Sequence, residues 1–206
     1  MPFQVLEFLQ GVGNFYGRGC KMTNVIRIEV PLNRDKVSFL KAGDNVLLNG
    51  TVYTGSAAAQ HKIVETLARG DRFEFDLCDQ IIYFVGPSPT KPGHVIGSAG
   101  PKANGWIEEY TPKLLAQGLT GIIGKGSCSQ SIVDTFKEHR CVFFGAMGGE
   151  GALIAKQIVA SEVIAYPELG HDAIHRIQII DFPVVVILDS QGNNFYESAK
   201  SKYRRI

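Results

Sequence analysis

Two glycine-rich loops in the second half of the sequence each precede a predicted helix, and each contains a lysine. The stretch GSAGPKANGWIEEYTPKLL (97–115) contains Lys102 and Trp106, the only tryptophan of the chain. The stretch GIIGKGSCSQS (121–131) contains Lys125 between two glycines. Backbone N–H groups at the beginning of a helix attract anions, and a lysine adds a full positive charge. Both loops are therefore candidate sites for a phosphate or a carboxylate.

The spacing within 121–131 does not fit the phosphate loop of nucleotide-binding enzymes. Counting back from Gly124 and Lys125, the first glycine that this motif requires falls on Leu119. A carboxylate is therefore at least as good a candidate ligand as a phosphate, and a tight strand–helix turn with a surface lysine is the alternative. The stretch GVGNFYG (11–17) has the glycines of a dinucleotide loop, but no predicted strand precedes it.

Four other features could carry chemistry, and most of them have a simpler structural interpretation. His171 and His175 are four residues apart, which suits a metal if the segment is helical, but no third ligand is nearby, so a surface or structural pair is favoured. Cys128 lies beside a predicted helix start, which can lower a thiol pKa, but no base partner is evident. The glycines of 144–156 favour close packing over ligand binding. His61, at the start of a predicted helix, can face a cleft.

The composition is that of an ordinary globular protein, and it excludes several classes of function. The chain has 206 residues, of which 45% are hydrophobic and 20% are charged, and its formal net charge is +1. This charge is too small to favour nucleic acid or an anionic lipid surface as a partner. No apolar run approaches the ~20 residues that a membrane helix needs, and the N-terminus lacks the pattern of a signal peptide.

The four cysteines are far apart and form no CxxC pair. Their positions are 20, 78, 128 and 141. This spacing argues against a zinc ribbon or a self-contained iron–sulfur site, and it favours reduced thiols in a cytoplasmic protein. Residues 1–22 differ in composition from the rest of the chain. We interpret them as an N-terminal extension and residues 23–206 as the folded domain.

Predicted strands and helices alternate along the chain and would position the candidate residues. Strands are predicted at 25–30, 80–87, 120–124, 141–145, 161–166 and 182–190. Helices are predicted at 56–70, with Ser56 as its cap, and at 107–117, 129–139 and 150–160. Asn49-Gly50 predicts a hairpin that divides 40–55 into two short strands. This pattern indicates an α/β fold, a layered β/β/α domain with a mixed sheet and covering helices.

Four stretches together resemble a known enzyme family. They are LKAGDNVLLNGTVYTG (40–55), GSAGP…EEYTPKLL (97–115), GIIGKG (121–126) and AYPELGHDAIHRIQIIDFPVVVILDSQGNNFYE (165–197). In order and spacing they resemble the C-terminal domain of the class I fumarases and the β subunit of the L(+)-tartrate dehydratases, which are iron–sulfur hydro-lyases. The resemblance covers most of the chain beyond the extension. It implies a swivelling β/β/α domain that closes the site and binds the substrate carboxylates.

Enzymes of this family remove water reversibly from 2-hydroxy dicarboxylates. The resemblance implies a [4Fe–4S] cluster held by three cysteines of an α domain or α subunit, with an open iron that binds the substrate hydroxyl. It also implies that this chain acts with a separate α-type subunit, in a homo-oligomer or an α2β2 assembly. No metal ligand is predicted in the chain itself.

The chain departs from the family pattern at a first substrate-binding motif. Family members read like TxRDxxH where this chain has TGSAAAQH (54–61). Ser56 stands at the position of the carboxylate-binding arginine and Gln60 at the position of the histidine, so that His61 comes one residue late. A lost arginine removes charged hydrogen bonds that are worth about 1.5–3 kcal/mol each.

A second motif also departs from the pattern. Family members read like GPTTSxRM where this chain has GPKANGWI (100–107). Lys102 replaces a threonine that is often assigned a catalytic role, and Trp106 replaces a second arginine. Lys102 can restore one positive charge, and Lys125 of the GKG motif is retained. These replacements predict a hydro-lyase subunit with altered substrate recognition, and the alternative is an inactive paralogue that binds small carboxylates or has a regulatory role.

The predicted site combines the two loops with the start of the helix at 56–70. The predicted catalytic residues are Lys125 and Lys102. The predicted substrate-binding residues are Ser56, Gln60, His61, Ser98, Gly100, Trp106, Gly126 and Ser127.

Overall fold

The computed structural model describes residues 25–71, 75–102, 107–146 and 151–204. The strands of this part are β1 (Val25–Val30), β2 (Asn45–Thr54), β3 (Ile81–Tyr83), β4 (Gly121–Gly124), β5 (Val142–Gly145), β6 (Ile158–Ala165) and β7 (Ile174–Leu188). The helices are α2 (Arg34–Phe39), α3 (Ala57–Ala68), α4 (Ile107–Ala116), α5 (Gln130–Glu138), α6 (Gly151–Ala155) and α7 (Phe195–Tyr203), with a 3-10 helix η1 (Pro167–Asp172). The predicted extension 1–22 and Trp106 lie outside the described residues. None of the helices described is long and apolar enough to cross a membrane.

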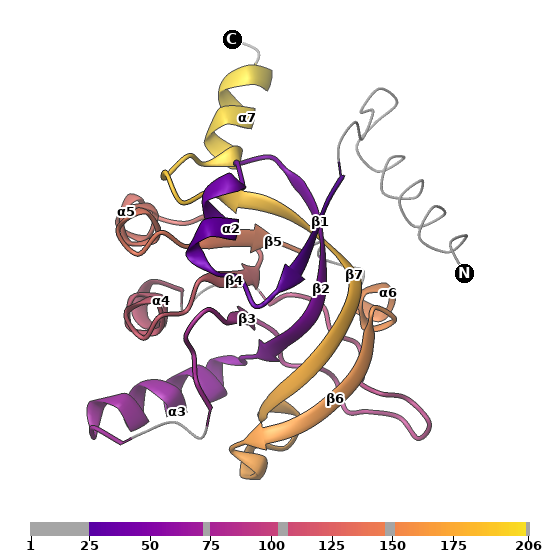
Figure 1. The fold of residues 1–206 in the computed structure, drawn as a ribbon. Coiled ribbons are helices and arrows are strands. Elements are labelled where there is room, and N and C mark those ends of the chain that lie inside the picture. Colours follow the sequence, from indigo (N-terminus) through magenta and orange to yellow (C-terminus); the bar gives the residue numbers. More distant parts are fainter. Residues whose placement is uncertain (1–24, 72–74, 103–106, 147–150, 205–206) are drawn as a thin grey trace.

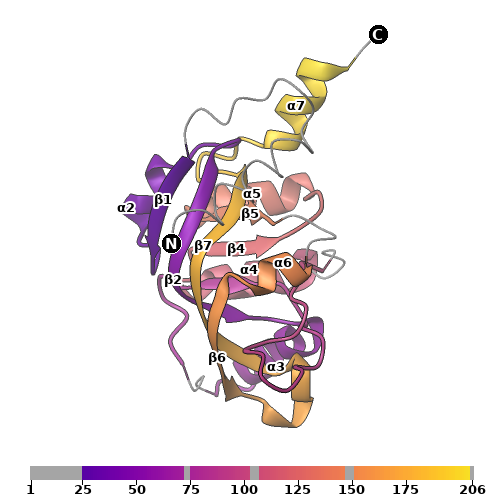
Figure 2. The ribbon, with the colours of Figure 1, turned by 90° about the vertical axis from the view of Figure 1, so that its right-hand side faces the viewer.

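The strands form one mixed sheet that closes on itself (Figure 1). β2, β3, β4 and β5 are parallel neighbours in that order, and β7 pairs antiparallel with β5. β7 also pairs antiparallel with β2, so that these five strands form a ring. β1 joins β2 and β6 joins β7 outside this ring. Figure 2 shows that β2 and β7 cross the direction of β4, which divides the sheet into two layers.

Alternate side chains of the parallel strands enter two different hydrophobic cores. Ile81 and Tyr83 of β3 lie in a core shared with β2 and β7, where the Tyr83 ring is edge-on to Phe182 with centroids 5.3 Å apart. Ile82 lies in the opposite core, together with apolar side chains of α3, α4 and α5. Strands with both faces buried are typical of a sheet covered by helices. The two β layers and one helical layer confirm the predicted α/β fold with a mixed sheet and covering helices.

The predicted hairpin at Asn49-Gly50 is wrong. Residues 45–54 form the single strand β2, and its pairing with β7 shifts in register between Leu48 and Gly50. Gly50 has a φ of 116°, and a Cβ there would lie 2.7 Å from the carbonyl oxygen of Val30. The glycine therefore marks a bulge where a neighbouring backbone approaches closely, and the chain does not turn back.

The boundary between α6 and β6 also differs from the prediction. The helix ends at Ala155 and not at residue 160, because Ile158 already pairs with Ile179 of β7. β7 itself begins at Ile174, well before the predicted start at residue 182. Both differences have one cause. β7 is long enough to pair with β2, β5 and β6, and the pairing with the distant β2 is not visible in the local sequence.

Candidate active site at the carboxyl ends of the parallel strands

The loops that follow the parallel strands begin side by side. The N–H of Gly55, after β2, donates to the carbonyl of Tyr83 at 2.9 Å. The N–H of Phe84, after β3, donates to the carbonyl of Ile123 in β4 at 2.7 Å. In both closed and open α/β sheets, ligands commonly bind at the carboxyl ends of the parallel strands. The predicted residues Ser56, Lys102 and Lys125 all follow strands at this edge.

Lys102 forms an ion pair with Asp172, a residue that the motifs of the sequence do not include in the site. The Lys102 Nζ lies 3.5 Å from the Asp172 Oδ1, and its backbone N–H donates to the Phe84 carbonyl at 3.1 Å. Gly86 makes room for this pair, since a Cβ there would lie 2.3 Å from each of these two side-chain atoms. The Lys102 side chain is 55% exposed, so the pair itself adds little stability.

Ser56 is buried, and both of its hydrogen bonds stay within the chain. Its Oγ accepts from the N–H of Ala59 at 3.1 Å, which caps α3 as predicted. The same hydroxyl donates to the carbonyl of Asp172 at 2.9 Å. Ser56 therefore joins the start of α3 to the residue that holds Lys102, and it is a structural neighbour of the pair.

Gln60 and His61 point in different directions from α3. Gln60 is buried, its Nε2 donates to the Gly55 carbonyl at 2.8 Å, and its Oε1 is buried without a partner among the described residues. His61 is 57% exposed, and its Nδ1 lies 3.6 Å from the Glu65 carboxylate on the next helical turn. Of these two predicted residues, only Gln60 contacts the loop that follows β2, through its bond to Gly55.

Lys125 lies partly buried after β4, and it has no ion pair among the residues described. Gly126 follows with a φ of 109°, a conformation that favours glycine, and Ser127 is exposed. The next residue but one, Ser129, caps α5. Its backbone N–H and its Oγ both donate to the Glu108 carboxylate, at 3.3 and 2.7 Å. An internal carboxylate thus already occupies the start of α5, and Lys125 remains the positive group that is open to a ligand.

Ser98 and Gly100 belong to a loop that is fastened to α6. The Ser88 N–H donates to the Ser98 carbonyl at 3.0 Å, and the Ser98 N–H donates to the Ser88 Oγ at 2.8 Å. Ala99 donates to the Gly151 carbonyl at 3.0 Å, and a Cβ on Gly100 would lie 3.4 Å from the Gly151 Cα. Here a glycine of the 144–156 loop serves close packing, as predicted.

The described cysteines and histidines do not form a metal site. Burial raises the pKa of the Cys128 thiol to about 12, with a further contribution from Glu108, so this thiol is not activated by its helix. Burial also raises the pKa of Cys141 to about 12. His171 lies in η1 and His175 in β7, so the helix that would place both on one face does not form. No group of three His, Cys, Asp or Glu side chains in the described residues could hold a metal ion.

Three residues of the site were missed by sequence reasoning. Asp172 is singled out by no motif in the sequence, and its role depends on the connection between β6 and β7 folding back on the strand ends. Gly86 lies near the end of the predicted strand 80–87 and carries no motif. Glu108 is in the first turn of α4, where an acidic residue stabilises its own helix, so its contact with Ser129 of α5 had no local signal.

Comparisons with known proteins identify the family of the chain. Residues 15–199 match the family model described as the fumarase C-terminus. The chain is 34% identical to the aerobic class I fumarate hydratase of Salmonella typhimurium over 182 residues, which are 84% of this chain and 31% of that protein. It is 32% identical to the anaerobic class I fumarate hydratase of Escherichia coli, over 85% of this chain and 33% of that protein.

A shorter relative matches over nearly its whole length. The chain is 32% identical to the putative L(+)-tartrate dehydratase subunit beta of Methanocaldococcus jannaschii, over 83% of this chain and 91% of that protein. By contrast, the chain spans about a third of the length of the curated fumarate hydratases that it matches. These matches, together with the β/β/α architecture, show that the chain belongs to the fumarase C-terminus family of hydro-lyases.

Proposed function

We propose that this chain is the β-type subunit of a cytoplasmic hydro-lyase that acts on a 2-hydroxy dicarboxylate. A cluster-bearing α-type subunit completes the enzyme, in an α2β2 or related assembly. The observation that carries the proposal is the placement of Lys102 and Lys125 after the neighbouring parallel strands β3 and β4, at the edge where α/β sheets bind ligands. Two ammonium groups at this edge suit a substrate with two carboxylates.

The two lysines have different surroundings, and we assign them different roles. Lys125 has no ion pair among the described residues, so it is available to bind one substrate carboxylate. Lys102 is paired with Asp172 at 3.5 Å, which favours one direction of its ammonium. As the proton leaves the carbon next to the hydroxyl carbon, negative charge develops on the adjoining carboxylate. A positioned ammonium stabilises that charge, which is how Lys102 contributes to catalysis.

The iron–sulfur cluster belongs to the partner in this proposal. The cysteines of the described part are unsuited to hold it, since Cys78 is exposed, Cys141 is buried and hydrogen-bonded to the Leu119 carbonyl, and the three thiols form no ligand group. When bound by the α-type subunit, the cluster supplies the Lewis acid that polarises the leaving hydroxyl. The residues of this chain bind and orient the two carboxylates.

Two observations favour the second candidate, a binding or regulatory module without turnover. Ser56, at the position of the family arginine, has both hydrogen bonds inside the chain and is 3% exposed. Glu108 occupies the start of α5, where a substrate carboxylate could otherwise bind. Both features reduce the number of donors open to a dicarboxylate.

Anaerobic co-expression with the α-type subunit of the same organism tests the proposal. We expect a brown complex that hydrates or dehydrates at least one of fumarate, malate and tartrate. Lys125→Ala should lower kcat/KM by about tenfold to a hundredfold, the loss of one charged hydrogen bond, without unfolding the chain. Lys113→Ala, on the exposed side of α4, is the matched control and should leave kcat/KM unchanged.

Each other outcome has a distinct meaning. A complex that carries the cluster but turns over none of these acids contradicts catalysis, and binding of the acids by calorimetry would then support the second candidate. If Lys125→Ala and Lys113→Ala have the same kcat/KM as the unmodified complex, the assignment of Lys125 is wrong.

A further inference from the structure

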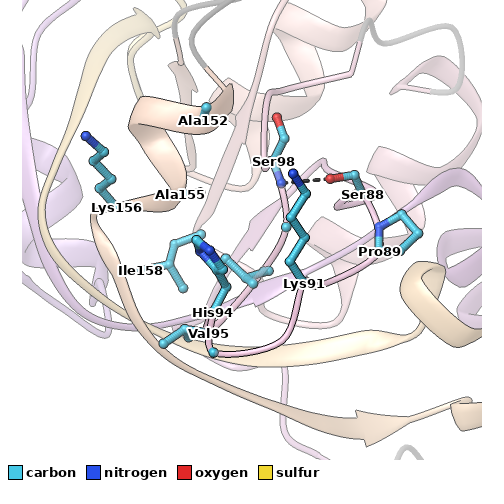
Figure 3. A pocket seen from close by; sticks show the side chains of 13 residues that line it. Ser88, Pro89, Lys91, His94, Val95, Ser98, Ala152, Ala155, Lys156 and Ile158 are labelled. Carbon is cyan, nitrogen blue, oxygen red and sulfur yellow. Dashed lines mark hydrogen bonds between the residues drawn. The ribbon is translucent and has the colours of Figure 1, made fainter.

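A groove lies between the loop of residues 88–98, here called the arm, and the helix α6 with the start of β6 (Figure 3). Its volume is about 630 Å³. Lys91 and His94 extend from the arm into the groove, and Lys156 stands at its rim beyond α6. Ser98, a predicted substrate-binding residue, lines the groove at the base of the arm.

The arm has a defined structure although it projects from the body of the protein. In Figure 1 it extends outward past α6 and β6. Residues 90–95 are all exposed, so the tip is not held by packing against the rest of the chain. The paired hydrogen bonds of Ser88 and Ser98 close its base, and the His94 N–H donates to the Lys91 carbonyl at 3.1 Å near the tip. An arm held in this way presents a preformed surface to a partner.

The segments that form the groove expose apolar side chains. Val95, which lines the groove, is 46% exposed. Leu153 of α6 and Val159 of β6 belong to the same segments but not to the lining, and they are 40% and 45% exposed. Exposed apolar side chains in a groove suit a partner that also brings apolar side chains.

The charge of the groove indicates the chemistry of its occupant. Lys91, His94 and Lys156 are basic, and no acidic side chain is among the described residues that line the groove. The whole chain carries a net charge of only +1, so this basic excess is local. No aromatic ring is among the described residues of the lining, which leaves no stacking surface there for a nucleic-acid base. A protein segment with carboxylate and apolar side chains fits these features.

The groove adjoins the candidate active site. Ser88 lines the groove, and Gly86, two residues before it, lies against the Lys102–Asp172 pair, since a Cβ there would lie 2.3 Å from an atom of each side chain. A partner that fills the groove therefore lies beside the strand ends where Lys102 and Asp172 are found. The site needs such a cover, since the Lys102 side chain is 55% exposed and charges in water interact weakly.

We propose that this groove is the surface on which the α-type subunit docks, through a segment of acidic and apolar side chains. The inference rests on the proposed function, because it takes the partner to be the subunit that completes the active site. The inference goes beyond the proposed function because it says where that subunit binds and that the basic groove residues Lys91, His94 and Lys156 select it.

Charge reversal in the full chain tests the inference. The double variant Lys91→Glu/Lys156→Glu and the control Lys113→Glu/Lys137→Glu, on the exposed sides of α4 and α5, are each co-expressed with the α-type subunit. Sedimentation velocity measures the assembly, and circular dichroism checks that each chain is folded. We expect the groove variant to weaken the complex at least tenfold, and the control to assemble like the unmodified chain. Val95→Ser, which removes an apolar side chain of the lining and adds no repulsive charge, should also weaken it.

The outcomes separate the two proposals. If the unmodified chain forms a complex and both groove variants assemble equally well, the docking surface is wrong while the proposed function stands. If the unmodified chain forms no complex with the α-type subunit, the proposed function fails, and the docking inference fails with it. If the groove variants abolish self-association of the chain but not assembly with the α-type subunit, a second copy occupies the groove, which also overturns the inference.

Discussion

Replacement of Ser56 by alanine removes two hydrogen bonds that are both visible in the structure. The hydroxyl accepts from the N–H of Ala59, 3.1 Å away, and donates to the carbonyl of Asp172, 2.9 Å away. Ser56 is 3% exposed, so water cannot easily take the place of the hydroxyl. The substitution therefore leaves one donor at the start of α3 and one acceptor in η1 without a partner.

The cost of this change can be worked out from the two bonds. Loss of an N-cap costs about 1 kcal/mol. The bond to the Asp172 carbonyl is partly buried, and a carbonyl that loses its donor away from water costs roughly 1–3 kcal/mol. We therefore expect Ser56→Ala to lower the free energy of unfolding by about 2–4 kcal/mol in total. For a chain of this length each kcal/mol lowers Tm by about 2–4 °C, so the shift in Tm is large enough to measure easily.

Urea unfolding of the full chain, followed by circular dichroism, measures the loss. Ser129→Ala is the matched control, because Ser129 caps α5 through the N–H of Ile132 but is exposed. The Ser129 hydroxyl also donates to the Glu108 carboxylate at 2.7 Å, but water can take its place at this exposed position, so we expect the control to lose little more than the cap, about 1 kcal/mol. If Ser56→Ala lowers the free energy of unfolding by no more than Ser129→Ala does, the bond to Asp172 does not hold η1 against α3, and the reasoning is refuted.

Two further predictions concern the arm and the pH dependence of stability. A Cβ on Gly97 would lie 2.0 Å from the Ser88 carbonyl oxygen, so Gly97→Ala should lower the free energy of unfolding by more than about 2 kcal/mol, measured by thermal unfolding. Gly93→Ala is the control. A Cβ there would meet no atom within 4 Å, so only the positive φ of 79° opposes it, and we expect a loss of about 1 kcal/mol. Burial lowers the pKa of His175 below its usual 6.5, so the unfolded chain binds the proton first and stability should fall as the pH drops below about 6.5. His175→Gln should flatten this dependence in urea titrations, and an unchanged slope would contradict it.

Sequence periodicity predicted the part of the fold that depends on neighbouring residues. The short apolar runs 120–124 and 141–145 and the apolar face of 129–139 correspond to β4, β5 and α5, because each element buries the apolar side chains that its own sequence already displays. The hairpin predicted at Asn49-Gly50 is wrong for the opposite reason. The local signal is that of a turn, but the pairing of β2 with the distant β7 makes it a bulge.

The candidate site was predictable to a similar extent. Lys102 and Lys125 could be found from the sequence, because each follows a strand in a glycine-rich loop and the carboxyl ends of parallel strands meet. Asp172 could not be found from the sequence. Its position depends on η1, which connects β6 to β7 and brings Asp172 back to the strand ends. Nor could local pattern tell that Gln60 is buried while the adjacent His61 faces solvent.

Asp172 joins two parts of the site that the sequence keeps far apart. Its carbonyl accepts from Ser56 at the start of α3, and its carboxylate holds Lys102 in the loop after β3. A substrate carboxylate that binds Lys102 must compete with the Asp172 carboxylate for the same ammonium. Because an exposed ion pair contributes only about 0–1 kcal/mol, a dicarboxylate can displace Asp172 at little cost. In the proposed function, Asp172 therefore holds Lys102 near the strand ends before the substrate binds without preventing its use afterwards, which is what a substrate-binding lysine exposed to water requires.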